Sequence, residues 1–243
     1  MERGLTIVIG TGEIGAPLLE VLSSRYRTRG VDVEPVEITE RVDVMHVCYP
    51  FQIGDFVGTT VEYIEKYSPS LVIINSTVAP GTTRKVAERA PGVKVAYSPV
   101  RGKHKKMKQD LLFYTKFVAG VEKEWGEEAA SHFACAGVKV RLFSSPEALE
   151  LAKLLSTTYF GLLIAWAQEM DRFAKNLNVD YDEITQFFEE IPYFPKTKFF
   201  PGFIGGHCVI PNIHILRMDF PSPFLDAILD SNERKKKELE GRE

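Results

Sequence analysis

Cys208 is the residue of this sequence whose type and neighbours best suit covalent chemistry. It stands in PGFIGGHCVIPN, residues 201–212, after two glycines and a histidine and shortly before a proline. A thiolate is a strong nucleophile, and neighbouring glycines let a bulky ligand approach the backbone. The opposite interpretation is a small apolar filler in a tight turn, which is the commoner role of a cysteine. His207 either helps to hold the thiolate or is simply exposed.

A glycine-rich turn near the N-terminus predicts a dinucleotide site. GTGEIG matches the pattern G-x-G-x-x-G, follows an apolar run and opens a stretch of helical spacing. Small residues let such a turn approach a pyrophosphate, and the helix behind it offers free N–H groups. Asp32 follows Gly10 by about the 20 positions expected of an acid that binds a ribose hydroxyl, which favours NAD over NADP. Arg29 on the same strand weakens that preference, and a fold that has lost its ligand is the alternative. The predicted cofactor contacts are Gly10, Thr11, Gly12, Glu13, Ile14, Gly15, Asp32, Tyr49 and Thr77.

The elements that must position these residues alternate between strand-like and helical runs. Helical stretches, such as 55–67 and 123–136, separate several of the short β runs, which predicts a parallel sheet with helices on both faces. The β runs cover 5–10, 28–33, 42–49, 70–76, 93–98, 115–120 and 138–143. The interval between the second and third runs is too short for a full crossover helix.

After about residue 145 the pattern becomes helical. One period runs from a cap at Ser144 or Ser145 to about residue 178, a second helix begins at Asp180, and a charged helix covers about 222–240. We therefore predict an α/β fold: a Rossmann-type, mostly parallel sheet with a smaller helical domain carried on one long helix. The expected boundaries are 1–145 for the NAD-binding domain and 146–243 for the helical substrate and dimerisation domain.

The composition indicates a soluble protein of the cytoplasm. Of 243 residues, 44% are hydrophobic and 26% charged, and a net charge of −3 gives no reason to expect nucleic acid or an anionic membrane as partner. Three widely spaced cysteines do not suggest a disulfide framework. The N-terminus begins directly with a strand, so no signal peptide is expected, and the apolar stretch 159–167 is too short to span a bilayer. No metal site is expected.

Four segments, together with the glycine turn, resemble the nucleotide-sugar 6-dehydrogenases, the family of UDP-glucose, GDP-mannose and UDP-N-acetylhexosamine dehydrogenases. They are INSTVAPGTT at 74–83, YSPVRG at 97–102, ALELAKLLSTTYFGLLIAWAQEM at 148–170 and PGFIGGHCVIP at 201–211. The resemblance implies an NAD-dependent dehydrogenase acting on CH–OH donors, in which Cys208 attacks an aldehyde and carries a thiohemiacetal and then a thioester. It assigns Lys153 to the oxyanion or the attacking water and leads us to expect the Cys208 sulfur and the Lys153 ammonium together at a bound nicotinamide.

The sequence departs from the family pattern at three chemically important positions. Val100 replaces a glutamate, Thr157 replaces an asparagine after the lysine, and Asn212 replaces an aspartate after the cysteine. We keep Thr157 and Asn212 as candidate catalytic residues, although neither is a base at neutral pH. The chain also ends near where relatives begin a nucleotide-binding domain, so the resemblance is to a truncated member, and a partner chain is one possible source of the missing surface. Oxidation of a nucleotide sugar by four electrons is less favoured than in the family, while a smaller anionic alcohol or a two-electron oxidation stays open.

Two further features have open interpretations. KHKKMK, residues 103–108, is either a loop that meets an anionic substrate or a solvated charge run. The long helix carries a stripe of aromatic and aliphatic side chains, which is either the seam of a homodimer or packs within its own subunit. The stripe consists of Tyr159, Leu162, Leu163, Trp166 and Met170. His46, within an apolar strand, is more simply a satisfied core residue.

Three functions therefore remain. The leading one is NAD-dependent oxidation of a sugar-like, anionic alcohol; the others are a dehydrogenase of the β-hydroxyacid type, which also uses a lysine on the long helix, and a non-catalytic NAD- or nucleotide-binding protein.

Overall fold

The computed structural model describes residues 4–33, 36–102, 106–193 and 199–241. The chain forms two compact units, Met1–Lys153 and Leu154–Glu243. The division falls within one long helix, α6 (Pro146–Leu177), whereas the sequence placed the domain boundary at the beginning of that helix. We refer to the two parts as unit 1 and unit 2.

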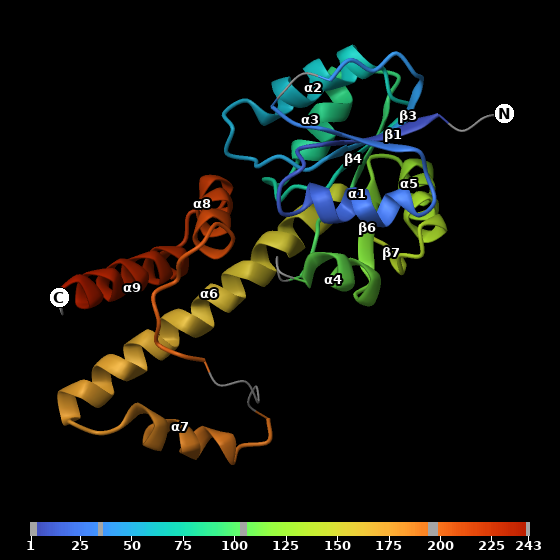
Figure 1. Ribbon diagram of the computed structural model, residues 1–243. Helices are drawn as coiled ribbons and strands as arrows, with labels where there is room; N and C mark the ends of the chain where they lie inside the picture. Colours follow the sequence, from blue (N-terminus) through green and yellow to red (C-terminus); the bar gives the residue numbers. More distant parts are fainter. Residues whose placement is uncertain (1–3, 34–35, 103–105, 194–198, 242–243) are drawn as a thin grey trace. The chain divides into compact units, whose positions relative to one another are not determined.

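Unit 1 is built on a seven-stranded, mostly parallel sheet (Figure 1). Its spatial order is β2-β1-β3-β4-β5-β6-β7, and neighbouring strands run parallel except for β5 and β6. The strands are β1 (Leu5–Ile9), β2 (Thr28–Val31), β3 (Val42–Val47), β4 (Leu71–Ile74), β5 (Lys94–Tyr97), β6 (Lys116–Gly120) and β7 (Val140–Leu142). All seven lie within the predicted runs, and the described residues between β2 and β3 form no helix.

The strand order reverses at β1, the second strand of the sheet. β1 lies between β2 and β3, so the chain moves to one side of β1 and then returns to the other. Ligands of open α/β sheets bind at such a reversal, outside the carboxyl ends of the strands. The turn that begins at Gly10 follows β1, and Cys48 and Tyr49 follow β3, at this edge.

Helices cover both faces of the sheet, as strands buried on both sides require. β4 is LVII and every one of its residues is buried, which is the pattern of a central parallel strand. The apolar core on one face includes side chains of α2 (Phe56–Tyr67) and α3 (Thr82–Arg89). The core on the other face includes α1 (Gly15–Ser23), α4 (Met107–Phe113) and α5 (Lys123–Cys135), as Figure 1 shows. The predicted fold class is confirmed.

Within its described residues, unit 2 contains helices and no strand. After α6 come α7 (Tyr181–Glu189), α8 (Val209–Asp219) and α9 (Pro223–Glu240). The predicted caps are present: Ser145 Oγ accepts from Ala148 N at 3.2 Å, and Asp180 Oδ1 accepts from Asp182 N at 2.7 Å. Such side chains satisfy N–H groups that have no partner within the helix.

The sequence patterns did not predict three of the observed helices, α3, α4 and α8. α8 begins at Val209, so Cys208 occupies its N-cap position and Pro211 lies in its first turn. Proline is tolerated there because the first N–H groups of a helix lack intrahelical acceptors. The segment taken as a tight turn therefore continues into a helix immediately after the cysteine.

α6 is long and apolar enough to cross a lipid bilayer, judged by length and composition alone. Within its most apolar stretch, 33% of the residues are buried inside the protein. The core helix of a soluble protein can meet the same two criteria, so length and composition do not show whether α6 lies in a membrane or in a soluble protein. The expectation of no membrane partner stays a prediction.

Candidate cofactor site and reactive residues

The glycine turn has the local geometry that a dinucleotide site needs. Gly10 has φ +86°, and a Cβ there would lie 2.8 Å from the Tyr49 nitrogen. At Gly15 a Cβ would lie 1.8 Å from the Gly10 carbonyl oxygen. A Cβ on Gly12, by contrast, would meet no atom of the described residues within 4 Å. Close packing of the chain explains the outer two glycines, whereas the middle one faces open space at the beginning of α1.

Asp32 is bonded to the glycine turn from the end of β2. Its Oδ2 accepts from Thr11 Oγ1 at 2.5 Å and from Thr11 N at 2.8 Å, while Oδ1 accepts from Val33 N at 2.9 Å. These hydrogen bonds, led by the Thr11 hydroxyl, lower the pKa of Asp32 below its usual value. The carboxylate is exposed, and since a carboxylate has about four acceptor positions, it keeps capacity for a further donor.

The basic side chain that weakened the NAD prediction is occupied elsewhere. Arg29 Nη1 lies 3.9 Å from Glu40 Oε2 and donates to the Glu37 carbonyl at 3.4 Å. Arg27 pairs with the same glutamate at 2.5 Å. Glu40 therefore offsets the positive charge that would otherwise attract a ribose phosphate near Asp32.

The remaining predicted cofactor residues lie around this edge of the sheet. Glu13 is exposed, and Ile14 is the N-cap residue of α1. The Tyr49 hydroxyl pairs with Thr60 Oγ1 at 2.6 Å, which directs it toward α2. Thr77 is the one residue of 71–79 that is not fully buried, just past the carboxyl end of β4.

A buried lysine that the sequence reasoning missed lies under the YSPVRG segment. Lys116 on β6 is 5% exposed, donates to the Ser98 carbonyl at 2.8 Å and lies 4.8 Å from the centre of the Phe133 ring. Burial is the main cause that lowers its pKa to about 7, and the charge of half-buried Lys153 acts in the same direction. A lysine inside the apolar run 115–120 was the available signal, because lysine is seldom buried without a task.

In unit 2, two of the predicted catalytic residues lie together. Asn212 is 5% exposed and its Nδ2 donates to Thr157 Oγ1 at 3.2 Å, while that hydroxyl donates to the Leu154 carbonyl at 2.9 Å. Cys208 is half-buried, and its carbonyl accepts from Asn212 N at 3.2 Å. Gly206, with φ +77°, precedes it in open space among the described residues. Since Lys153 and Cys208 lie in different units, their expected convergence stays a prediction.

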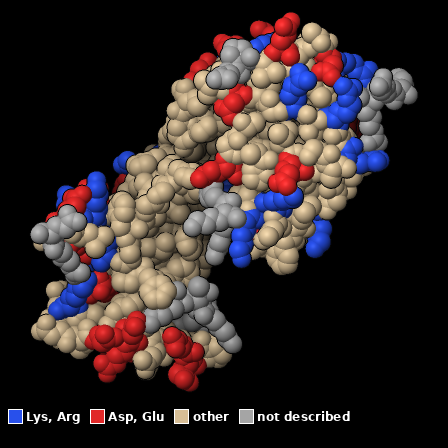
Figure 2. All heavy atoms as spheres, in the orientation of Figure 1, with Lys and Arg blue, Asp and Glu red and all other residues tan. Residues whose placement is uncertain are grey.

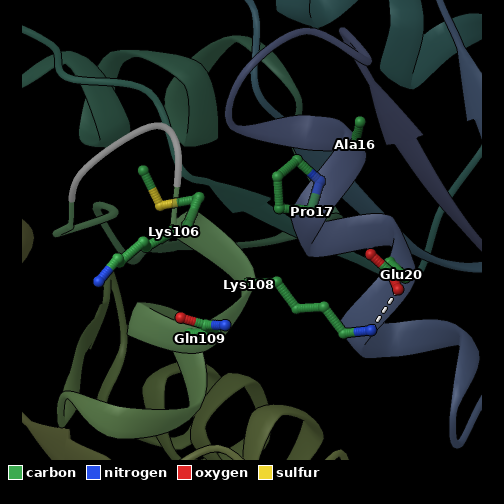
Figure 3. Close-up of a pocket in the computed structure, with 7 residues that line it drawn as sticks. Ala16, Pro17, Glu20, Lys106, Lys108 and Gln109 are labelled. Carbon is green, nitrogen blue, oxygen red and sulfur yellow. Dashed lines mark hydrogen bonds and ion pairs between the residues drawn. The ribbon is translucent and has the colours of Figure 1, made fainter.

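The basic segment 103–108 lies partly outside the described residues. Of its later part, Lys106 and Lys108 line a hollow of about 350 Å³ between α1 and α4, together with Glu20 and Gln109 (Figure 3). Lys108 forms an ion pair with Glu20, and its extended side chain is visible in the figure. One of these lysines is thus already matched by a carboxylate, so the two interpretations of the segment stay open.

Histidine, cysteine and acidic side chains do not gather into a metal site within the described parts of the chain. His46 is fully buried and pairs with His132 at 3.0 Å between their Nε2 atoms, which confirms its interpretation as a satisfied core residue. Its partner is 86 residues away in the sequence.

Comparisons with known proteins confirm the family resemblance. Residues 147–234 match the model of the UDP-glucose/GDP-mannose dehydrogenase family, central domain. A UDP-N-acetyl-D-mannosamine dehydrogenase of Methanocaldococcus jannaschii is 25% identical over 185 residues, which cover 70% of this chain and 43% of that protein. The matches cover between 36% and 58% of the curated relatives, so the chain spans about half their length.

Solved structures share the fold over nearly the whole chain. UDP-D-ManNAc dehydrogenase from Pyrococcus horikoshii has a TM-score of 0.84 at 21% identity, over 98% of this chain and 70% of that one. The 3-hydroxyisobutyrate dehydrogenase of Mycobacterium tuberculosis has a TM-score of 0.72 at 16% identity, over 97% of this chain and 94% of that one. At these identities the likeness shows the fold alone.

Proposed function

From this resemblance we propose that the chain is an NAD-dependent oxidoreductase that acts on the CH–OH group of a sugar-like, anionic alcohol. The observation that carries the proposal is the glycine turn: Gly10 and Gly15 are required by the packing of the chain, while Gly12 leaves open space at the beginning of α1. Such an opening at a helix N-terminus suits a pyrophosphate. The family match over residues 147–234 supports the reaction class.

The residues of the turn fit NAD. Residues 10–15 would hold the pyrophosphate, Asp32 would accept from a ribose hydroxyl, and Tyr49 and Thr77 would line the same edge of the sheet. A phosphate on that ribose would place negative charge beside the ionised Asp32, which favours NAD over NADP. When bound, NAD supplies an acceptor for hydride.

The proposed reaction uses Cys208 as nucleophile. Loss of a hydride and a proton from the alcohol gives an aldehyde, to which the Cys208 sulfur adds to form a thiohemiacetal. Loss of a second hydride, together with the hydroxyl proton of the thiohemiacetal, gives a thioester, and water then releases the acid and restores the thiol. The partly exposed sulfur at the beginning of α8 supports this role, since a helix N-terminus favours negative charge. Lys153 would stabilise the oxyanion.

The polar pair beside the cysteine limits what the site can do. Thr157 and Asn212 bond to each other and orient donors and acceptors, but neither removes a proton at neutral pH. Val100 is 4% exposed and offers no carboxylate. A single two-electron oxidation therefore demands less of this chain than the full four-electron reaction. The same three positions support the alternative of a non-catalytic NAD- or nucleotide-binding protein.

A second candidate is a dehydrogenase of the β-hydroxyacid type. The match to the 3-hydroxyisobutyrate dehydrogenase covers 94% of that protein's length, so this chain contains nearly all the elements of that fold. That chemistry would use Lys153 and needs no thiol. The two candidates therefore differ in their dependence on Cys208.

The decisive experiment compares Cys208→Ser with Cys135→Ser, an exposed cysteine of α5 that serves as control. We first measure NAD and NADP affinity by calorimetry, then NADH production with nucleotide sugars and small hydroxyacids. The covalent mechanism predicts that Cys208→Ser loses turnover by about 10³-fold or more, while Cys135→Ser keeps it. Full turnover in Cys208→Ser contradicts the covalent mechanism and favours the hydroxyacid type. NAD binding without turnover of any substrate favours the non-catalytic alternative.

We also propose that the chain forms a homodimer through α6. Five of its exposed apolar side chains recur at intervals of three, four or seven residues, typical of a helix–helix seam. They are Leu155, Tyr159, Leu162, Trp166 and Phe173. Of the predicted stripe, Leu163 and Met170 are partly covered within the chain. Figure 2 shows few charged side chains over the middle of this helix.

A further inference from the structure

Glu150 is a fully buried carboxylate with an unusual set of partners. It lies in the second turn of α6 and has 0% exposed surface. Its Oε2 accepts from Gly81 N at 2.6 Å, and its Oε1 accepts from Thr83 N at 2.9 Å and from Thr83 Oγ1 at 2.6 Å. Burial raises the pKa of Glu150, while these donors from Thr83 and Gly81 oppose the rise. A buried carboxylate is costly unless its oxygens are bonded in this way.

These partners are the beginning of helix α3. Gly81 is the N-cap residue of α3, with φ +85°, and no local side chain caps that helix. Glu150, 69 residues further along the sequence, supplies the missing acceptor. The first N–H groups of a helix lack partners and carry partial positive charge, so a carboxylate is a strong cap. One side chain of α6 therefore fixes where and how α3 begins.

The cap connects two segments that the proposed function uses within unit 1. Thr77 stands four residues before Gly81, in the stretch between β4 and α3. Lys153 follows Glu150 by three residues, about one turn of α6. We propose that Glu150 is a positioning residue, which holds the Thr77 segment in register with the part of α6 that carries Lys153. This inference rests on the proposed function of both residues.

The test uses Glu150→Gln, which keeps the shape of the side chain and removes one acceptor. Its amide NH₂ must face the N–H of Gly81 or the two donors of Thr83. The matched control is Glu147→Gln, one turn earlier, whose carboxylate pairs with Arg84 of α3 at 2.6 Å and is 34% exposed. Both variants change the same charge between the same two helices, but only one disturbs the cap.

We expect Glu150→Gln to weaken NAD binding about 10-fold to 100-fold, the loss expected for charge-assisted hydrogen bonds, and to lower kcat further where turnover is measurable. Glu147→Gln should keep both within about 2-fold. Thr83→Val removes only the hydroxyl donor and should give an intermediate loss of NAD affinity; it decides the question if Glu150→Gln does not fold. Calorimetry with NAD is the first readout and steady-state kinetics the second.

The outcomes separate this inference from the proposed function. A folded Glu150→Gln with wild-type NAD affinity and turnover, including one that is merely less stable to urea, overturns the positioning role. A wild-type chain that binds NAD and oxidises nothing overturns the proposed reaction alone, and the NAD affinities still test Glu150. A wild-type chain that does not bind NAD overturns both.

Discussion

At the scale of single residues, the buried histidine pair has a defined arrangement of protons. Asn75 Nδ2 donates to the Ile73 carbonyl at 3.0 Å and lies 3.2 Å from His46 Nδ1, which must therefore accept. His46 consequently carries its proton on Nε2 and donates to His132 Nε2 at 3.0 Å. An additional proton on either ring would bury a positive charge. It would also bring two N–H groups face to face, at Nε2 of His132 or at Nδ1 of His46. The pair is thus built for neutral imidazoles.

This arrangement predicts acid lability of unit 1. Burial, followed by the charges of His132 and Lys116, lowers the pKa of His46 well below its usual value. Since the unfolded chain binds the proton more readily, stability is present above about pH 6.5 and falls as the pH drops below it. We expect a loss of about 1.2 kcal/mol between pH 7.0 and 5.5 from this residue. The pKa of Lys116 is lowered to about 7 in the folded chain, so this lysine takes up its proton near the upper end of the window and adds a smaller loss of stability in the same direction.

Urea unfolding followed by Trp125 fluorescence in a Trp166→Phe background measures this loss. The two tryptophans lie in different units, so the remaining signal reports unit 1. His46→Gln should be less stable at pH 7 but lose less on acidification. An equal pH slope in both proteins would assign the effect to other groups.

How well the sequence predicts the role of a residue depends on how far along the chain its interaction partners lie. The Gly10–Gly15 turn and Asp32 are visible because strand, turn and acid follow one another closely along the chain. The partners of His46, Lys116 and Glu150 come from segments far away in the sequence, and nothing local announces them. The role of Glu150 in capping α3 emerged only once both helices were in place.

At the scale of elements, a network of ion pairs joins α6 to α9 in unit 2. Lys235 Nζ lies 2.9 Å from Asp171 Oδ2 and 3.0 Å from Glu238 Oε2, and its side chain is 6% exposed. Arg172 bonds Glu238 from the other helix at 2.6 Å. Burial opposes the charge of Asp171, yet hydrogen bonds from lysines outweigh it and lower its pKa. Ser231 of α9 adds a buried hydrogen bond from its Oγ to Gln168 Oε1 of α6 at 2.9 Å, so ion pairs and hydrogen bonds together fix the register of the two helices.

We predict that Lys235→Met destabilises unit 2 by about 2 kcal/mol, because it removes the most buried cation of the network, while Asp171 keeps Lys175 and Glu238 keeps Arg172. Lys236→Met, next in the sequence, removes only an exposed pair with Glu240 at 3.9 Å and should cost less than about 0.5 kcal/mol. Urea unfolding followed by Trp166 in a Trp125→Phe background measures both. Equal effects of the two substitutions would contradict a special role for the network.

Elements were predictable where their periodicity is long and their caps are local. The long helix was expected over 146–178 and is observed as Pro146–Leu177, with Ser145 as cap. α8 was missed because two glycines precede it and Pro211 interrupts its sequence pattern. α4 has only 7 residues, too few for a clear period.

At the scale of the whole molecule, the proposed dimer makes a prediction about assembly. Trp166→Glu and Leu162→Glu should shift the chain from dimer to monomer in sedimentation equilibrium, because each would bury a charge in the seam. Phe187→Glu on α7, where the ring is 75% exposed, is the control and should leave the assembly unchanged. A wild-type chain that stays monomeric at tens of micromolar refutes the seam, and flotation with lipid vesicles would assign the stripe to a membrane instead.

The contact between Thr11 and Asp32 has a consequence for the rate of the proposed NAD binding. The turn is fastened to the neighbouring strand by the protein's own groups, so its shape exists before any ligand arrives. The entropy of ordering this loop is thus lost during folding and not at the moment of encounter. We therefore expect NAD to associate in a single step, without a slow rearrangement of the turn that would bind its adenosine ribose.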